Sequence, residues 1–264
     1  MVKILIIGKK SFIGSHLKKY LSRYFVVNNY SFEQIIKKKK SLLQTYSHVI
    51  NTSIHKNYIN NKYNQKFDLD IKFINNFKNC NFRYLFLNTR KVYFQKENIS
   101  ERSKILPIDN YGRNKYFTET LLKKKLADNL ISLRISNVIG KKIFKNKRNN
   151  HKLFFDNFLE YKKNNKKISI NDNFKDFITI DQFCTVIKKI INSKIYGTYN
   201  VSLSKKVYIS EIVSWIDKRF LKNIKFYKAD SNSFTLSNKK IKKRIKINLS
   251  KRQLMLFCKR LVKK

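Results

Sequence analysis

The sequence predicts an α/β fold built on a doubly wound parallel sheet, and three observations support this. Several short runs are apolar at consecutive positions, as expected for strands buried on both faces of a sheet. Segments with apolar residues at helical spacing separate these runs. The first run, Val2–Ile7, is followed by Gly8 and Gly14, which gives a strand, a glycine turn and the start of a helix. The free N–H groups and the dipole at the start of such a helix favour a bound phosphate.

Strands and helices alternate through the first half of the chain. The apolar runs predict strands at Val2–Ile7, Phe25–Tyr30, Ser47–Ser53, Tyr84–Leu87 and Ile131–Ile135. The spacing of apolar residues predicts helices that begin near Ile13, cover Asp68–Lys78, and run from the Tyr111–Lys115 region to Leu126. We expect these elements to form the larger part of the fold.

The second half is expected to add a smaller α/β region. Strands are predicted at Lys167–Ile170, Phe174–Ile180 and Gly197–Val201, and helices at Leu153–Tyr161, Gln182–Asn192, Glu211–Phe220 and Lys251–Leu261. Asp181, Ser210 and Ser250 stand where they can cap three of these helices. Lys141–Asn150 is polar and basic, and we expect an exposed loop there.

The strongest bias in composition is positive charge. The 264 residues include 60 Lys and Arg against 16 Asp and Glu, a formal net charge of +44. Such a charge can attract nucleic acid or an anionic membrane. However, lysines occur in every predicted segment and are not gathered in one arm. We therefore interpret the charge as a bias of composition and expect no nucleic-acid partner.

Other features of the composition favour a cytoplasmic protein without a membrane span. No apolar run approaches the ~20 residues that cross a bilayer, and no charged-then-apolar leader is present. Cys80, Cys184 and Cys258 are widely spaced and odd in number, which fits reduced thiols in the core. No group of His, Cys and acidic residues has the spacing of a metal site, so no metal is expected.

A tyrosine and a lysine four residues apart carry the chemistry that the sequence suggests. Tyr111 and Lys115 lie about one helical turn apart, so they share a helix face. An ammonium beside a phenol favours the phenolate, and we expect it to lower the pKa of Tyr111 from ~10 toward working pH. Thr89 follows the strand at Tyr84–Leu87, at the sheet edge where such folds bind ligands.

These motifs together resemble the extended short-chain dehydrogenase/reductase family, whose fold is a Rossmann-like doubly wound sheet with a small C-terminal α/β substrate-binding region. Gly8, Ser11 and Gly14 correspond to its Gly-x-x-Gly-x-x-Gly turn, with serine in place of the middle glycine. Thr89 stands three residues before a Val-Tyr pair, as the family's catalytic Ser or Thr does. Tyr111 and Lys115 match its Tyr-x-x-x-Lys pair.

The resemblance also implies residues that bind substrate and cofactor. Asn137 falls in a Leu-Arg-x-x-Asn-x-x-Gly stretch, and Lys175 replaces the arginine of an Arg-Asp-Phe-Ile stretch. Both are implied to contact the substrate near its diphosphate, and Thr89 is implied to contact the reacting oxygen. The residues implied to bind the cofactor are Gly8, Ser11, Phe12, Ile13, Gly14, Asn28, Asn29, Thr52, Ser53, Lys56, Tyr111 and Lys115.

The second strand bears on the choice of cofactor. Dinucleotide-binding folds commonly place an acid at its end to bind the ribose hydroxyls, but this chain has Asn28 and Asn29 there. The loss of a carboxylate removes its repulsion of a 2′-phosphate. We expect NAD or NADP, with NADP favoured.

The resemblance implies an NAD(P)-dependent epimerase or ketoreductase that transfers hydride at C4 of a nucleotide-diphosphate hexose, with Thr89, Tyr111 and Lys115 as its catalytic residues. Arg90 and Lys91 follow Thr89, where the 4,6-dehydratases of the family carry an Asp-Glu pair, so elimination is disfavoured. Epimerase and ketoreductase both remain open. The alternative is a catalytically silent Rossmann-fold protein that binds RNA or anionic surfaces through its charge.

The resemblance further implies how the chain is divided. Residues 1–140, with segments near 174–201, would form the NAD(P)-binding domain, and 141–173 with 202–264 would form the smaller substrate-binding region. A homodimer is the expected assembly.

Overall fold

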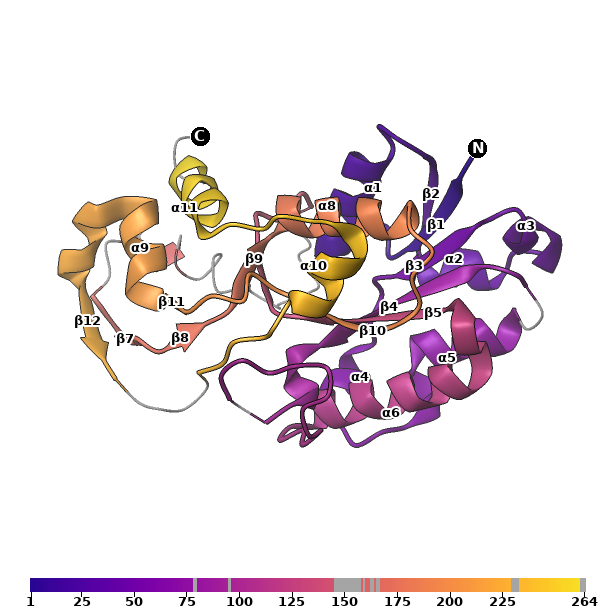
Figure 1. Cartoon of the computed structure of the whole chain (residues 1–264), viewed down its shortest axis with the longest axis horizontal. Helices are drawn as coiled ribbons and strands as arrows, with labels where there is room; N and C mark the ends of the chain where they lie inside the picture. Colours follow the sequence, from indigo (N-terminus) through magenta and orange to yellow (C-terminus); the bar gives the residue numbers. More distant parts are fainter. Residues whose placement is uncertain are drawn as a thin grey trace.

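The computed structural model describes residues 1–77, 80–94, 96–144, 158, 160, 161, 164, 167–228 and 233–261. Two lobes are visible in Figure 1, a larger one around a central sheet and a smaller one that carries the C-terminal elements.

The central sheet has six parallel strands and confirms the predicted fold class. In spatial order these are β10 (Gly197–Val201), β5 (Leu130–Ile135), β4 (Arg83–Thr89), β3 (His48–Asn51), β1 (Lys3–Ile7) and β2 (Val26–Tyr30). The order along the chain reverses between β1 and β3. Parallel sheets bind ligands in the crevice beyond the carboxyl ends of the strands at this point.

Helices cover both faces of the sheet because its strands are apolar on both faces. Helices α1 (Phe12–Leu21) and α8 (Ile180–Ile191) lie on one face, and α5 (Leu69–Asn76) and α6 (Asn110–Leu126) on the other. Neighbouring residues of β1 show this, since Ile4 packs in the apolar core on the side of α1 and α8, and Leu5 packs in the core on the side of α5 and α6. This is the doubly wound arrangement.

Short elements complete the larger lobe. They are α2 (Phe32–Ile36), α3 (Lys40–Gln44), α4 (Lys56–Asn60), and the 3₁₀ turns η1 (Gln65–Phe67), η2 (Arg90–Val92) and η3 (Ala127–Asn129). Helix α6 begins before Tyr111, so Tyr111 and Lys115 do lie on one helix as predicted.

The smaller lobe is built from three two-stranded ladders and their helices. The ladders pair β6 (Asn137–Ile139) with β9 (Phe177–Thr179), β8 (Phe174–Lys175) with β11 (Val207–Tyr208), and β7 (Ile168–Asn171) with β12 (Ile224–Tyr227). The helical elements are α9 (Ile209–Asp217), η4 (Lys218–Asn223), α10 (Lys239–Ile245) and α11 (Lys251–Arg260). Its apolar side chains join the core that α1 and α8 cover.

Three local predictions in this half were wrong. The strand predicted at Phe174–Ile180 is broken at Asp176, whose buried carboxylate accepts hydrogen bonds from the backbone N–H groups of Leu203, Ser204 and Leu236. Helix α8 is capped by Thr179 in place of Asp181, because Thr179 and Gln182 form a reciprocal capping box.

The third wrong prediction is the cap of α9. Ser210 lies inside the first turn, and its N–H and hydroxyl both donate to Asp172. Ser250 does cap α11, as predicted. The helix predicted at Leu153–Tyr161 and the loop beyond Phe144 lie almost entirely outside the described residues.

In the described part of the chain, no helix combines the length and the apolar character needed to cross a membrane. The same residues contain no group of three or more His, Cys, Asp or Glu that could hold a metal ion. Cys184 and Cys258 are buried free thiols, and Cys80 is partly buried.

Candidate active site

The glycine turn after β1 is closed by two hydroxyl groups. Gly8 has a φ of +117°, and a Cβ there would lie 2.3 Å from the Thr52 Oγ1. The Ser11 hydroxyl donates to the Gly8 carbonyl at 2.9 Å and lies 2.6 Å from the Thr52 hydroxyl. It also accepts from the N–H of Gly14 at 2.9 Å and so caps α1. The serine that replaces the middle glycine therefore stabilises the turn.

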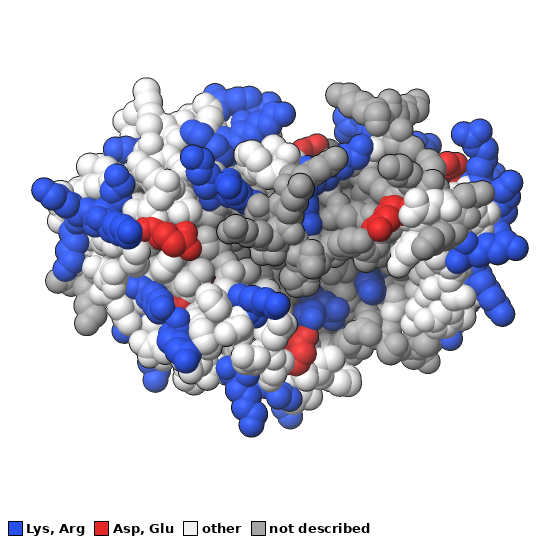
Figure 2. Space-filling view, turned by 180° about the vertical axis from the view of Figure 1, so that it is seen from behind, with Lys and Arg blue, Asp and Glu red and all other residues white. Residues whose placement is uncertain are grey.

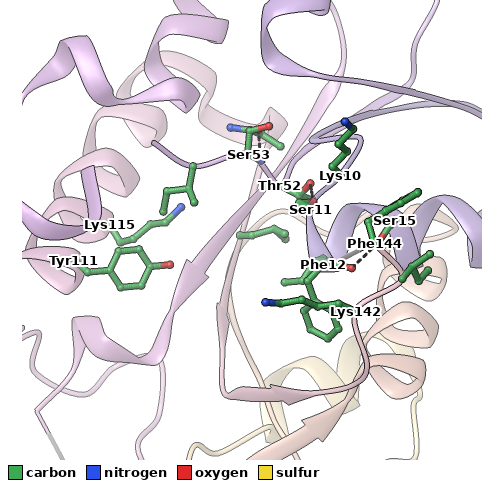
Figure 3. Close-up of a pocket in the computed structure, with 15 residues that line it drawn as sticks. Lys10, Ser11, Phe12, Ser15, Thr52, Ser53, Tyr111, Lys115, Lys142 and Phe144 are labelled. Atoms are coloured by element: carbon green, nitrogen blue, oxygen red, sulfur yellow. Dashed lines mark hydrogen bonds between the residues drawn. The ribbon is translucent and has the colours of Figure 1, made fainter. Parts of the chain in front are cut away.

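A cavity of about 300 Å³ opens beside this turn. Figure 3 shows its walls, with Ser11 and Phe12 at the start of α1 and Thr52 and Ser53 after β3 on one side, and Tyr111 and Lys115 of α6 across from them. The rest of the lining is Lys10, Ile13, Ser15, Asn51, Ile54, Leu87, Lys142, Ile143 and Phe144. The cavity thus joins the predicted cofactor turn to the predicted Tyr–Lys pair.

Two further cavities share lining residues with this one, and we call the three together the groove. A cavity of about 390 Å³ shares Phe12 and Ile13 with the first and is also lined by Asn137 and Lys175. A cavity of about 480 Å³ shares Ser15, Ile143 and Phe144 with the first and is also lined by Asn28 and Asn29. We call the section at Asn137 the substrate end and the section at Asn28 the ribose end, after the roles that the sequence predicts for these residues.

Tyr111 is held in a largely buried position that makes its phenol less acidic than expected. Burial raises its pKa above 10, and the positive charge of Lys115 opposes the rise without cancelling it. The predicted lowering of this pKa is therefore wrong as a net effect, although the predicted influence of Lys115 has the correct sign.

Lys115 is a buried ammonium with a buried counter-charge. Its Nζ lies 3.7 Å from the Asp70 Oδ2 and 4.4 Å from the ring centre of Phe86. The other carboxylate oxygen of Asp70 accepts from the Asn51 amide at 2.9 Å and from the Tyr84 hydroxyl at 2.7 Å. Helix α5 and strands β3 and β4 thus fix the carboxylate that faces Lys115.

Thr89 and Lys56 do not line the cavity that holds Tyr111. Thr89 ends β4, and its hydroxyl accepts from the Lys91 N–H at 3.3 Å. The 3₁₀ turn η2, which follows Thr89, packs against the start of α6, because a Cβ on Gly112 would lie only 2.2 Å from the Lys91 carbonyl oxygen. Lys56 begins α4 and is exposed.

Comparison with known proteins assigns the family. Residues 4–202 match the model of the NAD dependent epimerase/dehydratase family. The chain belongs to this family. No curated protein sequence matches it significantly.

Solved structures of the same fold cover nearly the whole chain. The UDP-N-acetylglucosamine 4-epimerase of Methanobrevibacter ruminantium M1 is 16% identical, with 99% of this chain and 97% of that chain covered and a TM-score of 0.77. The UDP-glucuronic acid 4-epimerase of Bacillus cereus, solved with NAD, is 18% identical, with 99% and 100% covered and a TM-score of 0.75. The dTDP-glucose 4,6-dehydratase of Bacillus anthracis, also solved with NAD, is 15% identical, with 98% and 96% covered and a TM-score of 0.77. At these identities the likeness shows the fold alone.

The residues at the turn fit the dinucleotide that the family name implies. A Cβ on Gly14 would lie 2.5 Å from the Thr52 Oγ1 and 2.6 Å from the Gly8 carbonyl oxygen, so the turn packs too closely for a larger residue. The N–H groups of Phe12 and Ile13, in the first turn of α1, have no intrahelical acceptor. They are the donors that a pyrophosphate at this helix end would use.

Several residues in or behind the groove were not found from the sequence. Asp70 sits in the helix predicted at Asp68–Lys78, but no local pattern connects it to Lys115. Lys142, Ile143 and Phe144 line the groove from the segment predicted as a loop, and Ile143 and Phe144 are about half exposed. Two apolar side chains, three and four residues after Gly140 in a basic segment, were the available signal.

Proposed function

We propose that this chain is an NAD(P)-dependent nucleotide-sugar epimerase or ketoreductase that acts at C4 of a nucleotide-diphosphate hexose. The observation that carries the proposal is that Tyr111 and Lys115 line the same cavity as the glycine turn. The comparison structures support the substrate class, since they include enzymes that act on UDP and dTDP sugars.

Five of the predicted site residues have a role in this proposal. The bound nicotinamide supplies the hydride donor or acceptor. The Tyr111 hydroxyl gives a proton to the C4 oxygen or takes one from it. The Lys115 ammonium, held by Asp70, stabilises negative charge on that phenol, and the Thr89 hydroxyl donates to the same sugar oxygen. Asn137 and Lys175 bind the substrate at the other end of the groove.

The raised pKa of Tyr111 suits donation of a proton to a keto oxygen, which is the step that a ketoreductase needs. Epimerisation requires Tyr111 both to take a proton and to give one, and both reactions stay within the proposal.

We propose NADP as the preferred cofactor. The ribose end of the groove is lined by Lys9, Lys18 and Lys19 beside Asn28 and Asn29, and no acidic residue of the described chain lines it. The Lys18 ammonium donates to the Val27 carbonyl, which leaves Lys9 and Lys19 for a 2′-phosphate. We expect tighter binding of NADPH than of NADH, and loss of that preference in the double variant Lys9→Ala, Lys19→Ala. Fluorescence titration measures both, and equal affinities in the unchanged protein would contradict the proposal.

The test of the reaction is substitution of Tyr111. We expect Tyr111→Phe to lower the turnover of nucleotide-sugar substrates about 10²- to 10⁴-fold, the usual contribution of a positioned acid or base. Tyr116→Phe is the matched control, because Tyr116 lies on the same helix and is 39% exposed. The assay uses UDP and dTDP hexoses and 4-keto-6-deoxyhexoses with NADH and with NADPH. An unchanged rate in Tyr111→Phe would contradict the proposed enzymatic role of Tyr111. Tight, salt-sensitive RNA binding would then favour a catalytically silent protein that binds RNA through its charge.

The division of the chain into two domains and the homodimer stay predictions. Analytical ultracentrifugation of the full chain tests the dimer.

A further inference from the structure

Lysines are abundant on this protein, and ion pairs distinguish a few of those in the described chain. Figure 2 shows Lys and Arg side chains spread over the described surface of one face, with few acidic side chains between them. Lys91 does have an acidic partner, since its Nζ lies 2.6 Å from the Asp109 Oδ2. The two side chains are 43% and 38% exposed, and an ion pair this open to water adds little to the stability of a fold. Its position, however, joins two elements of the candidate active site.

Lys91 holds the end of β4 against the start of α6 through three of its groups. Its N–H donates to the Thr89 hydroxyl at 3.3 Å. Its carbonyl oxygen packs against Gly112, where a Cβ would come within 2.2 Å. Its ammonium binds Asp109, which caps α6 by accepting from the Gly112 N–H at 2.7 Å. Lys91 therefore contacts Thr89 on one side and, on the other, the first turn of α6, which contains Tyr111.

These contacts suit the roles proposed for Thr89 and Tyr111. A hydroxyl that accepts from the Lys91 N–H keeps its own hydrogen free to donate to the sugar oxygen. The Lys91 Nζ lies 5.9 Å from the ring centre of Tyr111, which lines the groove. The ion pair thus lies between the predicted acid and the predicted oxygen-binding hydroxyl.

The acidic partner is held in its charged form. Burial raises the pKa of Asp109, but the hydrogen bonds from Lys91 and from the Gly112 N–H outweigh burial, and the pKa lies below its usual value. The ion pair therefore persists at neutral pH.

We propose that Lys91 and Asp109 are positioning residues, which set the distance between the Thr89 hydroxyl and the Tyr111 phenol. This inference rests on the proposed function, because it assigns the two residues a part in the same reaction. A shift of about 1 Å at a catalytic group can lower a rate about a hundredfold. Since an exposed ion pair contributes little to stability, its loss should affect turnover far more than folding.

The test removes each partner in turn and then both. We expect Lys91→Met and Asp109→Asn each to lower kcat about ten- to a hundredfold at neutral pH and to leave KM for the nucleotide sugar within about twofold. Asn is also a good capping residue, so we expect the midpoint of urea denaturation to stay unchanged in both variants. The double variant should be no slower than the slower single variant, because both changes remove one interaction. Lys91→Arg keeps the ion pair and should restore most of the activity.

The two single variants also separate position from charge. Lys91→Met removes a positive charge near Tyr111 and Asp109→Asn removes a negative one, so an effect of charge alone would have opposite signs in the two variants. Lys251→Met is the matched control, because Lys251 forms an ion pair of the same length with Glu211 in the smaller lobe, with side chains 36% and 32% exposed. We expect it to leave kcat unchanged.

Three outcomes would overturn the inference. They are an unchanged kcat in Lys91→Met, opposite effects in the two single variants, and a loss in the double variant equal to the product of the single losses. An equal fall of kcat in Lys251→Met would overturn it as well. In each of these cases the proposed function stands if Tyr111→Phe lowers turnover as expected. If the unchanged protein turns over no nucleotide sugar, or if Tyr111→Phe leaves the rate unchanged, the proposed function fails and this inference fails with it.

Discussion

The partly or fully buried cations of this protein differ in whether a carboxylate lies beside them. Lys115, in the cavity beside the glycine turn, faces a buried carboxylate, Asp70, at 3.7 Å. Arg90 and Lys175 are partly buried, and neither forms an ion pair with a carboxylate of the described chain. A cation with its own counter-charge is stabilised by the protein itself, whether or not a ligand is bound. A cation without one is stabilised by what binds to it.

The scarcity of acidic residues makes this difference more informative. The chain has only 16 Asp and Glu, yet Asp68, Asp70, Glu119 and Asp176 are buried in its described part. Buried carboxylates require charged or N–H partners, and these four have them. Two of the four, Asp70 and Glu119, pair with Lys115 and Arg134, so we call these two the framework cations.

Replacement of a framework cation should have the largest effect on stability. The Arg134 guanidinium donates to Glu119 at 2.7 Å and to the Tyr93 hydroxyl at 2.6 Å, and all three residues are buried. Arg134→Met leaves Glu119 as a buried charge with too few partners, and we expect the free energy of unfolding to fall by about 3–5 kcal/mol. Urea denaturation measures this.

Arg90→Met is the matched control for that experiment. It removes the same group from a site without a carboxylate, so we expect a loss of about 1 kcal/mol or less, from the contact with Phe234. If the free energy of unfolding fell equally in the two variants, a carboxylate partner would not distinguish the two arginines, and Arg90 would also contribute to the stability of the fold.

The sequence could predict what is local along the chain. The strand, glycine turn and helix at Val2–Leu21 follow from apolar spacing and two glycines, and the shared face of Tyr111 and Lys115 follows from helical periodicity. Caps were harder to predict, since Thr179 and Asp181 are both good capping residues, and the partner of Thr179 in the capping box, Gln182, decides between them.

What depends on tertiary contacts could not be predicted. Asp70 and Lys115 come from different helices, and Phe144 enters the groove from a segment with no regular pattern. The net acidity of Tyr111 was predicted with the wrong sign because burial, which no local pattern reveals, outweighs the neighbouring ammonium.

The second prediction concerns the carboxylate behind Lys115. Asp70 contributes to the raised pKa of Tyr111, because its negative charge disfavours a phenolate nearby. Asp70→Asn removes that charge, so the pKa of Tyr111 should fall. If Tyr111 donates a proton during reduction, the rate declines once pH exceeds this pKa, and the decline should begin at a lower pH in the variant. The pH profile of kcat/KM measures the shift.

Asp109→Asn is the control for the size of that shift. Asp109 also raises the pKa of Tyr111, but less than Asp70 does. We expect a shift in the same direction and of smaller size. A profile that moves to higher pH in Asp70→Asn would contradict the role of Asp70.

The smallest expected effect extends the comparison to uncharged groups. Ser11 gives the Gly14 N–H a partner inside the protein, whereas the N–H groups of Phe12 and Ile13 are left for a ligand. Ser11→Ala removes the cap, and we expect the free energy of unfolding to fall by about 0.5–2 kcal/mol. Cofactor affinity should fall about two- to tenfold, since the hydroxyl also holds the Gly8 carbonyl. Ser250→Ala removes a cap of the same kind from α11, away from the groove, so it should cost similar stability and leave cofactor affinity unchanged. If both variants weakened the cofactor equally, the turn at Ser11 would act on binding only through global stability, and its hydroxyl would have no separate part in holding the pyrophosphate site.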